Sequence, residues 1–451
     1  MKKLFLLVLA LAGLNSCQND DATTADSSFS LKATGASYDD QCTKPRVVVS
    51  GDITSNTTWT SDKVWVIRGV VRVKNNATLT INAGTYIIAD SSLATGANGV
   101  LVITRDGLIN AVGTAAAPIV FSSWKLVDCN ATTVAAPGDF GGVVLLGAAN
   151  VNTGLNTNII EGLGDQPTVA DFYYGGATDT DTSGTMKFVR IEYAGRKLPT
   201  DGDNGVEING LTFGGVGSGT TIDNIQVSWG LDDGYEWFGG TVNASHLVAF
   251  SNDDDSFDFD WGFKGTINKA ISIANKNSTH SLSGTSADSN GIELDNNATG
   301  TTTAIITKPI ITDLSIIGFK ASADAVALEN GIHVRRLGQI SLSRAVSTGY
   351  GAGSGTTAAG LRWDVDPTLS TKSVMSVHGF TNIVLQVTGG TYTNFQLLGS
   401  SPVTSVGGPA PTFDPSTTYQ PFYNEPNFSL AGGSTGAFAN EANWTATWTQ
   451  F

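Results

Sequence analysis

The chain has little basic charge. Of its 451 residues, 25 are Lys or Arg and 40 are Asp or Glu, so the formal net charge is −15. Proteins bind nucleic acid and anionic membrane surfaces through a basic footprint, so no nucleic acid is expected as a partner. Cations, neutral sugars and basic proteins remain as candidate ligands.

Histidine and cysteine are also scarce. The four histidines, at positions 246, 280, 333 and 378, include no H-x-x-x-H pair and have no neighbouring cysteine. This dispersal argues against a zinc site. A lone histidine usually has a structural role, and only His333 is singled out, because it occupies a position that carries charge in the repeats described below.

Long hydrophobic runs are nearly absent, and the one at the N-terminus has the features of a signal peptide. Lys2 and Lys3 precede eleven apolar residues, Leu4 to Leu14, and Asn15-Ser16-Cys17 follows them. This run is too short to span a bilayer as a helix. L-N-S-C resembles the lipobox of bacterial lipoproteins, which implies cleavage after residue 16 and lipidation of Cys17. The alternative is an ordinary secretory signal with a chance cysteine.

Residues 17–40 are rich in Ala, Thr, Ser and Asp and offer almost nothing to bury, so they are expected to form a flexible acidic tether. Loss of the two signal-peptide lysines changes the net charge from −15 to −17. Acidic residues directly after the lipidated cysteine resemble the surface-export signal of Bacteroidota lipoproteins. This resemblance implies an outer-membrane protein, anchored by its lipid and exposed at the cell surface; periplasmic retention is the alternative.

If Cys17 carries lipid, Cys42 and Cys129 are the only remaining cysteines. An oxidising compartment favours a disulfide between them, which would fasten the N-terminal entry of the fold. Two free thiols are the alternative.

The body of the chain has the composition of an all-β protein. It has 53 glycines and three methionines, and no convincing amphipathic helical segment. One strand motif recurs: N-G-V-E-I-N at 204–209, D-G-Y-E-W-F at 233–238, D-S-F-D-F-D at 255–260, N-G-I-E-L-D at 290–295, N-G-I-H-V-R at 330–335 and A-G-L-R-W-D at 359–364. The motif predicts a single-stranded right-handed parallel β-helix over residues 41–406, in which each repeat contacts its neighbours.

Side chains alternate along a strand, so the apolar members of the motif are expected to point inward and their charged partners outward. The outward column would be a ligand-binding face made of Glu207, Glu236, Asp258, Glu293, His333 and Arg362. Stacked coils bring equivalent residues to about 4.7–4.9 Å. Carboxylates at that distance repel, so a bound cation, a lysine or raised pKa values must relieve the repulsion. Trp229 and Trp261 lie near turns and are candidate rings of a sugar-binding cleft; core packing is the alternative for each.

Acidic residues are also dense at the corners beside this column. Oxygen ligands in such numbers suit Ca²⁺, and the candidate ligands are Asp232, Asp233, Asp253, Asp254, Asp255 and Asp260. The alternative is a solvated acidic surface on which Asn and Asp only form turns.

The block from Asp232 to Gly265 and the closing W-T-A-T-W-T-Q-F resemble a group of Bacteroidota surface lipoproteins, over residues 45–451. The resemblance implies the fold and the compartment and brings no activity. Residues 407–451 differ in composition and are expected to run back over the coils as an extended segment, with Trp444, Trp448 and Phe451 packed on the solenoid.

These features favour a non-catalytic surface module that binds a glycan or an outer-membrane partner protein, stabilised by Ca²⁺. The alternative is a β-helix polysaccharide lyase or glycoside hydrolase. Its catalytic residues would be Asp233, Asp255, His333 and Arg335, although the N-T-D, S-H-G and R-I-K runs of polygalacturonase-type hydrolases are missing.

Overall fold

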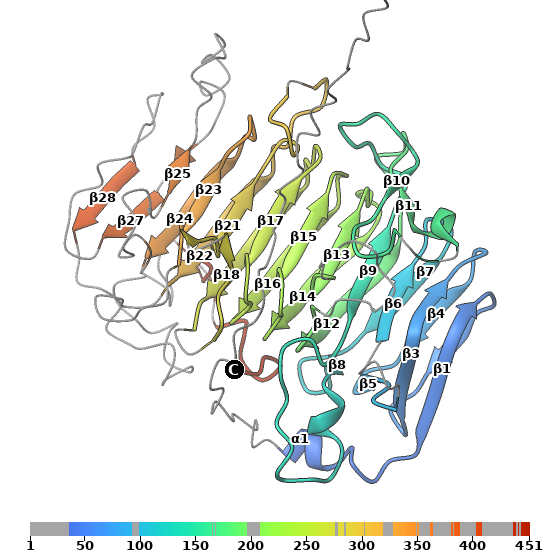
Figure 1. The fold of residues 1–451 in the computed structure, drawn as a ribbon. Helices are drawn as coiled ribbons and strands as arrows, with labels where there is room; N and C mark the ends of the chain where they lie inside the picture. Colours follow the sequence, from blue (N-terminus) through green and yellow to red (C-terminus); the bar gives the residue numbers. More distant parts are fainter. Residues whose placement is uncertain are drawn as a thin grey trace, which may run out of the picture.

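Each turn of the chain contributes a short strand to each of three parallel sheets, so the body is a right-handed parallel β-helix (Figure 1). The computed structural model describes residues 36–92, 99–164, 166, 168–195, 208–275, 278–283, 286–301, 303–318, 328–348, 350, 361–363, 380–381, 383–387, 403–407, 436–438, 441 and 443–451. The expected signal peptide, the lipidation site Cys17, most of the tether and Glu207 lie outside the described residues.

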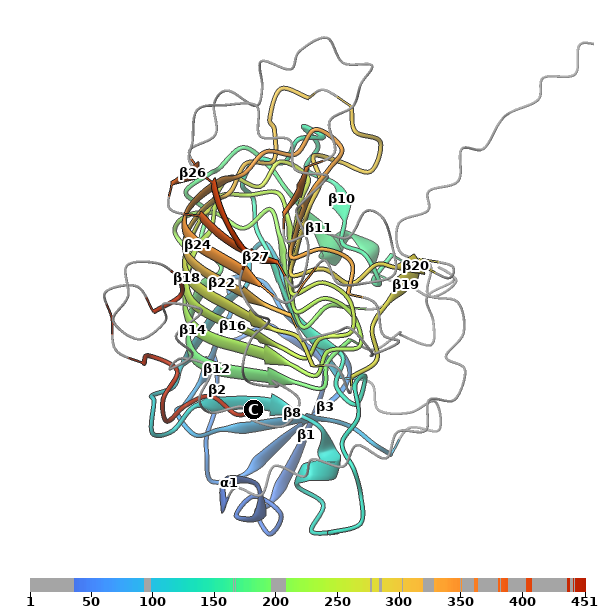
Figure 2. The ribbon, with the colours of Figure 1, turned by 90° about the vertical axis from the view of Figure 1, so that its left-hand side faces the viewer.

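The first sheet contains β2 (Thr57–Trp59), β4 (Thr78–Ile81), β7 (Leu108–Val112), the first halves of β12 (Gly184–Glu192), β14 (Thr221–Ser228), β16 (Asn243–Phe250), β18 (Thr266–Ile273), β22 (Ile310–Ile317) and β24 (Ser341–Thr348), and β26 (Phe380–Thr381). The second sheet contains β1 (Arg46–Ile53), β3 (Val64–Val73), β5 (Tyr86–Ala89), β8 (Ile119–Ser122), the second halves of the same six long strands, β27 (Ile383–Val387) and β28 (Val403–Gly407). Figure 2 shows the long strands stacked one above another.

The third sheet is the face that carries the repeated motif. It contains the ends of β1 and β3, then β6 (Gly99–Ile103), β9 (Gly142–Leu146), β13 (Leu211–Gly214), β15 (Tyr235–Phe238), β17 (Phe257–Asp260), β21 (Ile292–Leu294), β23 (Ile332–Val334) and β25 (Arg362–Trp363).

One left-handed residue makes the corner between the first and second sheets in each long strand. The backbone φ of these residues lies between 49° and 59°, at Phe188, Asn224, His246, Lys269, Asp313 and Arg344. A left-handed residue is unfavourable for most side chains, yet the same conformation recurs in six consecutive coils. The recurrence keeps the two sheets at a constant angle and the strands in register.

The inward side chains form one continuous apolar core, and its middle is a stack of aromatic rings. The ring centroids of Trp237 and Phe259 are 4.5 Å apart, and those of Phe213 and Trp237 are 5.2 Å apart. The buried Tyr235 hydroxyl donates to the backbone carbonyls of Ile225 (2.8 Å) and Val248 (3.0 Å). The core therefore holds the strands of the third sheet in a fixed register, which positions their outer side chains.

Segments outside the coils cover parts of the outer faces. Over the early coils of the second sheet lie α1 (Ala36–Asp39) and the region around η1 (Trp124–Leu126), which the Cys42–Cys129 disulfide joins. A covering segment, residues 151–164 and 168–174, lies over the early coils of the third sheet and contains β10 (Asn158–Ile159), η2 (Val169–Phe172) and β11 (Tyr173–Tyr174). A small hairpin, β19 (Leu282–Ser283) and β20 (Ser286–Ala287), extends from a later coil.

The C-terminal residues 443–451 pack on the outer face of the second sheet. Trp448 is buried in a cluster with Phe250 and Ile271, and the Phe451 ring meets that of Phe250 at 5.2 Å. The backbone N–H of Gln450 donates to the Gln226 side chain (2.8 Å), whose amide donates back to the Gln450 carbonyl. No helix in the described part of the chain is both long enough and apolar enough to cross a membrane.

Candidate functional site

A ladder of Asn and Asp side chains runs along the turn that precedes the third sheet. Its five residues, one in each coil, are Asn209, Asp233, Asp255, Asn290 and Asn330. The backbone N–H of each of the last four donates to the side-chain oxygen of the preceding ladder residue, at 3.3, 2.8, 2.5 and 3.0 Å in chain order. Buried backbone N–H groups need such acceptors. Asp233 and Asp255, expected as metal ligands or catalytic acids, therefore each commit one oxygen to the fold.

The charged column of the repeated motif stacks in register on the outer face of the third sheet. The strand pairings join Glu236 to Asp258, Asp258 to Glu293, Glu293 to His333 and His333 to Arg362. The position before Glu236 is occupied by Thr212.

The expectation that residues 204–209 form the first copy of this strand is wrong. The strand of that coil is β13, and Ile208 packs in an outer cluster with Val144 and Phe238. The true copy is N-G-L-T-F-G at 209–214, because Asn209 is the ladder residue and Gly210 corresponds to Gly234. Thr212 therefore occupies the first position of the column, where Glu207 was expected.

The column is also less exposed than the alternation of a bare strand predicts. Glu236 is 6 % exposed, Glu293 5 % and His333 3 %. Neighbouring side chains lie against these residues, among them Asn209 at Glu236, Arg335 at Glu293 and Glu329 at His333, so the charges of the column lie in a partly desolvated environment.

Acidic groups gather around β15 and β17. Carboxylate oxygens of Asp233, Glu236 and Asp258 lie within 4.8 Å of one another, and Asp233 also belongs to a second group with Asp232 and Asp254. Burial, and then neighbouring carboxylates, raise the pKa of Asp233, Glu236, Asp254 and Asp258 well above the ordinary values. Desolvation and like charge both disfavour the ionised form, so this cluster requires protons or a cation.

The other expected metal ligands stand outside these two groups. Burial raises the pKa of Asp253 to about 6, that of Asp255 to about 7 and that of Asp260 to about 8. Asp255 serves the ladder, and Asp260 accepts the backbone N–H of Trp261 at 2.6 Å. The cluster therefore contains half of the predicted set: Asp232, Asp233 and Asp254.

Two polar atoms at the cluster have no hydrogen-bond partner among the residues that the structure describes. One is Oδ1 of Asp258, and the other is Oγ1 of Thr212, whose residue is 2 % exposed. Thr212 stands on the same outer face as Glu236 and in register with it. A buried polar atom without a partner is costly, so these two atoms, on the strands that flank β15, make the acidic end of the column a candidate binding point.

Glu161, in the covering segment, reaches the same cluster. The Asn209 side-chain amide donates to Oε1 of Glu161 (3.0 Å) and also to Oε2 of Glu236. A hydrogen bond between the Glu161 and Glu236 carboxyl groups contributes to the raised pKa of Glu236. Sequence reasoning missed Glu161 because it lies outside every repeat, in an insertion between two coils.

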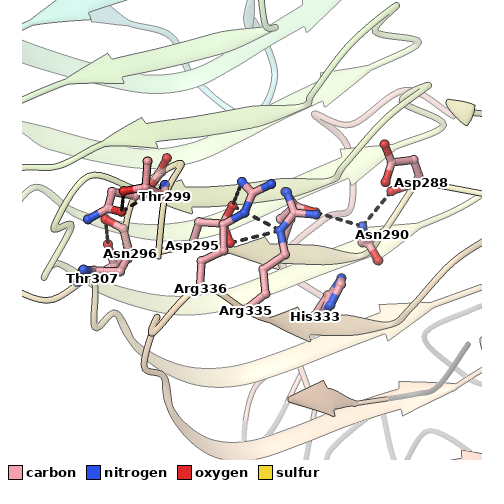
Figure 3. Close-up of polar contacts among 12 residues, drawn as sticks. Asp288, Asn290, Asp295, Asn296, Thr299, Thr307, His333, Arg335 and Arg336 are labelled. Carbon is pink, nitrogen blue, oxygen red and sulfur yellow. Dashed lines mark hydrogen bonds and ion pairs between the residues drawn. The ribbon is translucent and has the colours of Figure 1, made fainter. Parts of the chain in front are cut away.

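Basic side chains neutralise the column beyond β17 (Figure 3). Arg335 donates to Asp295 (3.0 Å) and pairs with Glu293, and Arg336 donates to Asp295 at 2.7 Å. Arg335, named above among the alternative catalytic residues, is therefore held between two carboxylates.

His333 and Arg362 share one carboxylate at the far end of the column. Nδ1 of His333 lies 3.4 Å from Oε2 of Glu329, and Arg362 pairs with Oε1 of Glu329 at 3.0 Å. The face is thus acidic at β15 and β17 and charge-balanced at β21 and β23.

The two candidate sugar-binding tryptophans lie apart from each other. Trp229 stacks on Tyr193 (6.3 Å between centroids) at the end of β14, beside the C-terminal Phe451, so it does not lie beside the charged column. Trp261 directly follows Asp260, and its ring packs against the cluster that contains Phe238. Only Trp261 borders the charged face.

Comparison with known proteins agrees with this architecture. A family model described as "Pectate-lyase like beta helix domain" matches residues 51–449. No curated protein and no solved structure matches the chain. The match covers most of the sequence and nearly all of the coils, so this chain belongs to the family of pectate-lyase-like β-helix domains.

Proposed function

We propose that the acidic part of the third sheet holds a Ca²⁺ ion between Asp233, Glu236 and Asp258, and that this ion binds carboxylated glycans at the cell surface. The observation that carries the proposal is a group of three adjacent carboxylates, in which Oδ1 of Asp258 has no hydrogen-bond partner among the described residues; the same is true of Oγ1 of Thr212, on the strand next to Glu236. All of these atoms are oxygens, which is the donor set that Ca²⁺ prefers.

A cation also accounts for the electrostatics. Among the residues that the structure describes, the basic side chains of this face pair with Glu293, Asp295 and Glu329, and none pairs with Asp233, Glu236 or Asp258. Three carboxylates in one buried place remain ionised at neutral pH only if positive charge is added. Ca²⁺ supplies that charge without requiring a protonated site.

The same ion explains how a chain with net charge −15 could bind an anionic polymer. Ca²⁺ takes six to eight oxygen ligands, and three carboxylates leave room for a carboxylate of the glycan. A lipid anchor at Cys17 in the outer membrane would then present the rod, as a binding or scaffold module, to extracellular polysaccharide or to a partner protein.

Calcium titration with thermal denaturation tests the cation site. At Ca²⁺ concentrations about 100 times Kd, the free energy of unfolding should rise by about 2.7 kcal/mol, and Asp258→Asn should abolish the rise. Asp106→Asn, at an exposed carboxylate, is the matched control. An unchanged denaturation midpoint in Ca²⁺ would refute the site.

Affinity electrophoresis in gels that contain polygalacturonate or alginate tests the ligand. We expect Ca²⁺ to retard the protein, and EGTA or Asp258→Asn to abolish the retardation. Equal mobility in gels with and without either polymer, in the presence of Ca²⁺, would contradict glycan binding by this face.

A second candidate function is cleavage of an acidic polysaccharide, which is consistent with the family. The Glu161–Glu236 pair favours it, since two carboxyl groups that share a proton can act as acid and base. The catalytic residues expected from the sequence are less suited to this chemistry. Asp233 and Asp255 each accept a backbone hydrogen bond of the ladder, and Arg335 is ion-paired. New reducing ends or unsaturated products from polygalacturonate or alginate, lost in Glu236→Gln, would establish an enzyme.

A further inference from the structure

The first strand of the solenoid has an open edge. β1 pairs with β3 alone among the strands that the structure describes, and Figure 1 shows it at the end of the rod. Residues 46–50 run straight beside residues 64–68, and the chain then bends at Gly51, whose φ is 73°. The edge strand of the first sheet at this end, β2, has only three residues. The open edge is therefore mainly that of residues 46–50.

The hydrogen bonds to β3 show which backbone groups of β1 point to the open edge. The carbonyl of Pro45 accepts the N–H of Val64 at 2.9 Å, so Pro45 faces β3. Successive residues of a strand direct their N–H and C=O groups to opposite sides within the sheet. Arg46, Val48 and Ser50 therefore direct theirs away from β3. The described residues make no hydrogen bond to these three N–H and three C=O groups.

The side chains of this strand do not protect the edge. Three consecutive valines occupy its middle, and Val48 is 48 % exposed. The strand has no lysine or proline, and the guanidinium of Arg46 turns back to donate to the carbonyl of Val127. Apolar edges without such protection pair readily with another strand. The first coil is thus a surface suited to a partner strand.

We propose that this partner is a second copy of the chain, joined through two antiparallel β1 strands across a two-fold axis. When Val48 lies opposite Val48 of the second copy, Arg46 lies opposite Ser50, and all the outward backbone groups of residues 46–50 are paired. Any other two-fold register leaves part of this short edge unpaired. The register also places no like charges opposite each other, because Arg46 faces a serine. The edge is thus complementary to itself.

The dimer is independent of the proposed cation site, because β1 carries none of the carboxylates that form it. It changes what the molecule presents, since each copy contributes one acidic end of the charged column. If both copies hold a cation, a polymer with repeated carboxylates can contact two sites at once. Two linked contacts raise the apparent affinity without any new interaction.

Sedimentation equilibrium without added Ca²⁺ measures the association. Small interfaces give weak complexes, so the protein is examined at concentrations up to about 1 mM. We expect a reversible dimer in the wild type and in Val112→Lys, the matched control, since Val112 is a 42 % exposed valine of β7 in the first sheet. Val48→Lys should weaken dimerisation about tenfold or more, because two lysines then lie opposite each other.

A cysteine substitution tests the register. Residues of a hydrogen-bonded antiparallel pair have Cα atoms about 5.5 Å apart, a distance that a disulfide can bridge. Oxidised Val48→Cys should therefore give a covalent dimer on a non-reducing gel. Ser50→Cys has the same native cysteines, but its two copies would lie about 13 Å apart in this register, so it should not cross-link.

Two results would overturn the proposal. One is a single-chain mass for the wild type at every concentration. The other is a dimer that persists in Val48→Lys and that Val48→Cys does not cross-link, because association would then use a surface other than β1.

Discussion

Replacement of Asp255 by asparagine should stabilise the calcium-free protein at pH 8 and have little effect at pH 4. Asp255 is 5 % exposed, and burial, followed by the charge of Asp288, raises its pKa to about 7. Its Oδ1 accepts the backbone N–H of Asn290 at 2.5 Å. Asparagine keeps that acceptor oxygen and carries no charge, so the substitution removes the electrostatic cost and preserves the ladder.

The sign and size follow from proton linkage. The unfolded chain releases the proton near pH 3.8, whereas the folded chain keeps it until about pH 7. As the pH rises between these two values, the folded chain holds a proton that the unfolded chain has released. The free energy of unfolding therefore falls by up to about 1.4 kcal/mol per pH unit, or about 4 kcal/mol in total. Below pH 4 both states are protonated and the cost vanishes; above pH 7 it is present in full.

Urea denaturation in EGTA at pH 4 and pH 8 measures this difference. Asp255→Asn should gain about 2–4 kcal/mol at pH 8, whereas Asp255→Ala, which loses the ladder acceptor, should lose about 1–3 kcal/mol at pH 4. An equal effect of Asp255→Asn at the two pH values would refute the reasoning, since only ionisation distinguishes them.

Three further substitutions test the packing. Changing both Cys42 and Cys129 to serine opens a loop with a sequence separation of 87 and should lower the free energy of unfolding by about 4 kcal/mol. The wild type should lose the same amount of stability when a reductant is present, and no loss in either case would contradict the disulfide. Trp448→Ala should cost about 3–5 kcal/mol in thermal denaturation, because the ring is 1 % exposed; a loss below 1 kcal/mol would contradict its docking. Tyr235→Phe should cost about 1–3 kcal/mol, since two carbonyls lose their donor, and an unchanged midpoint would refute that role.

The β-helix could be predicted from the sequence because its signal is repetition. The D-G-Y-E-W-F and D-S-F-D-F-D copies are one coil apart, and the structure pairs them residue by residue. The first copy was misplaced because N-G-V-E-I-N at 204–209 fits the pattern of polar and apolar residues better than the true N-G-L-T-F-G. The five coils of the ladder share an Asn or Asp followed by Gly or Ser, and Thr212 at the charged position concealed the copy at 209–214.

The candidate site was less predictable, for two physical reasons. Strand alternation assigns a side chain to the outer face, but it says nothing of the side chains from neighbouring turns that lie against it, so the burial of Glu236 and His333 was missed. Glu161 reaches the cluster from an insertion, where no period constrains its position. The corner aspartates were treated as equivalent, whereas a backbone hydrogen bond commits Asp255 to the turn.

The contact between Gln226 and Gln450 joins residues 224 positions apart, whereas neighbouring coils join residues only tens of positions apart. Local pairing can therefore wind the solenoid progressively, at low entropic cost for each loop. The apolar stripe of Val248, Phe250 and Ile271 on the outside of the second sheet must wait for a distant part of the chain. Until residues 443–451 dock, this stripe is exposed apolar surface and promotes aggregation. Docking of these residues buries the stripe.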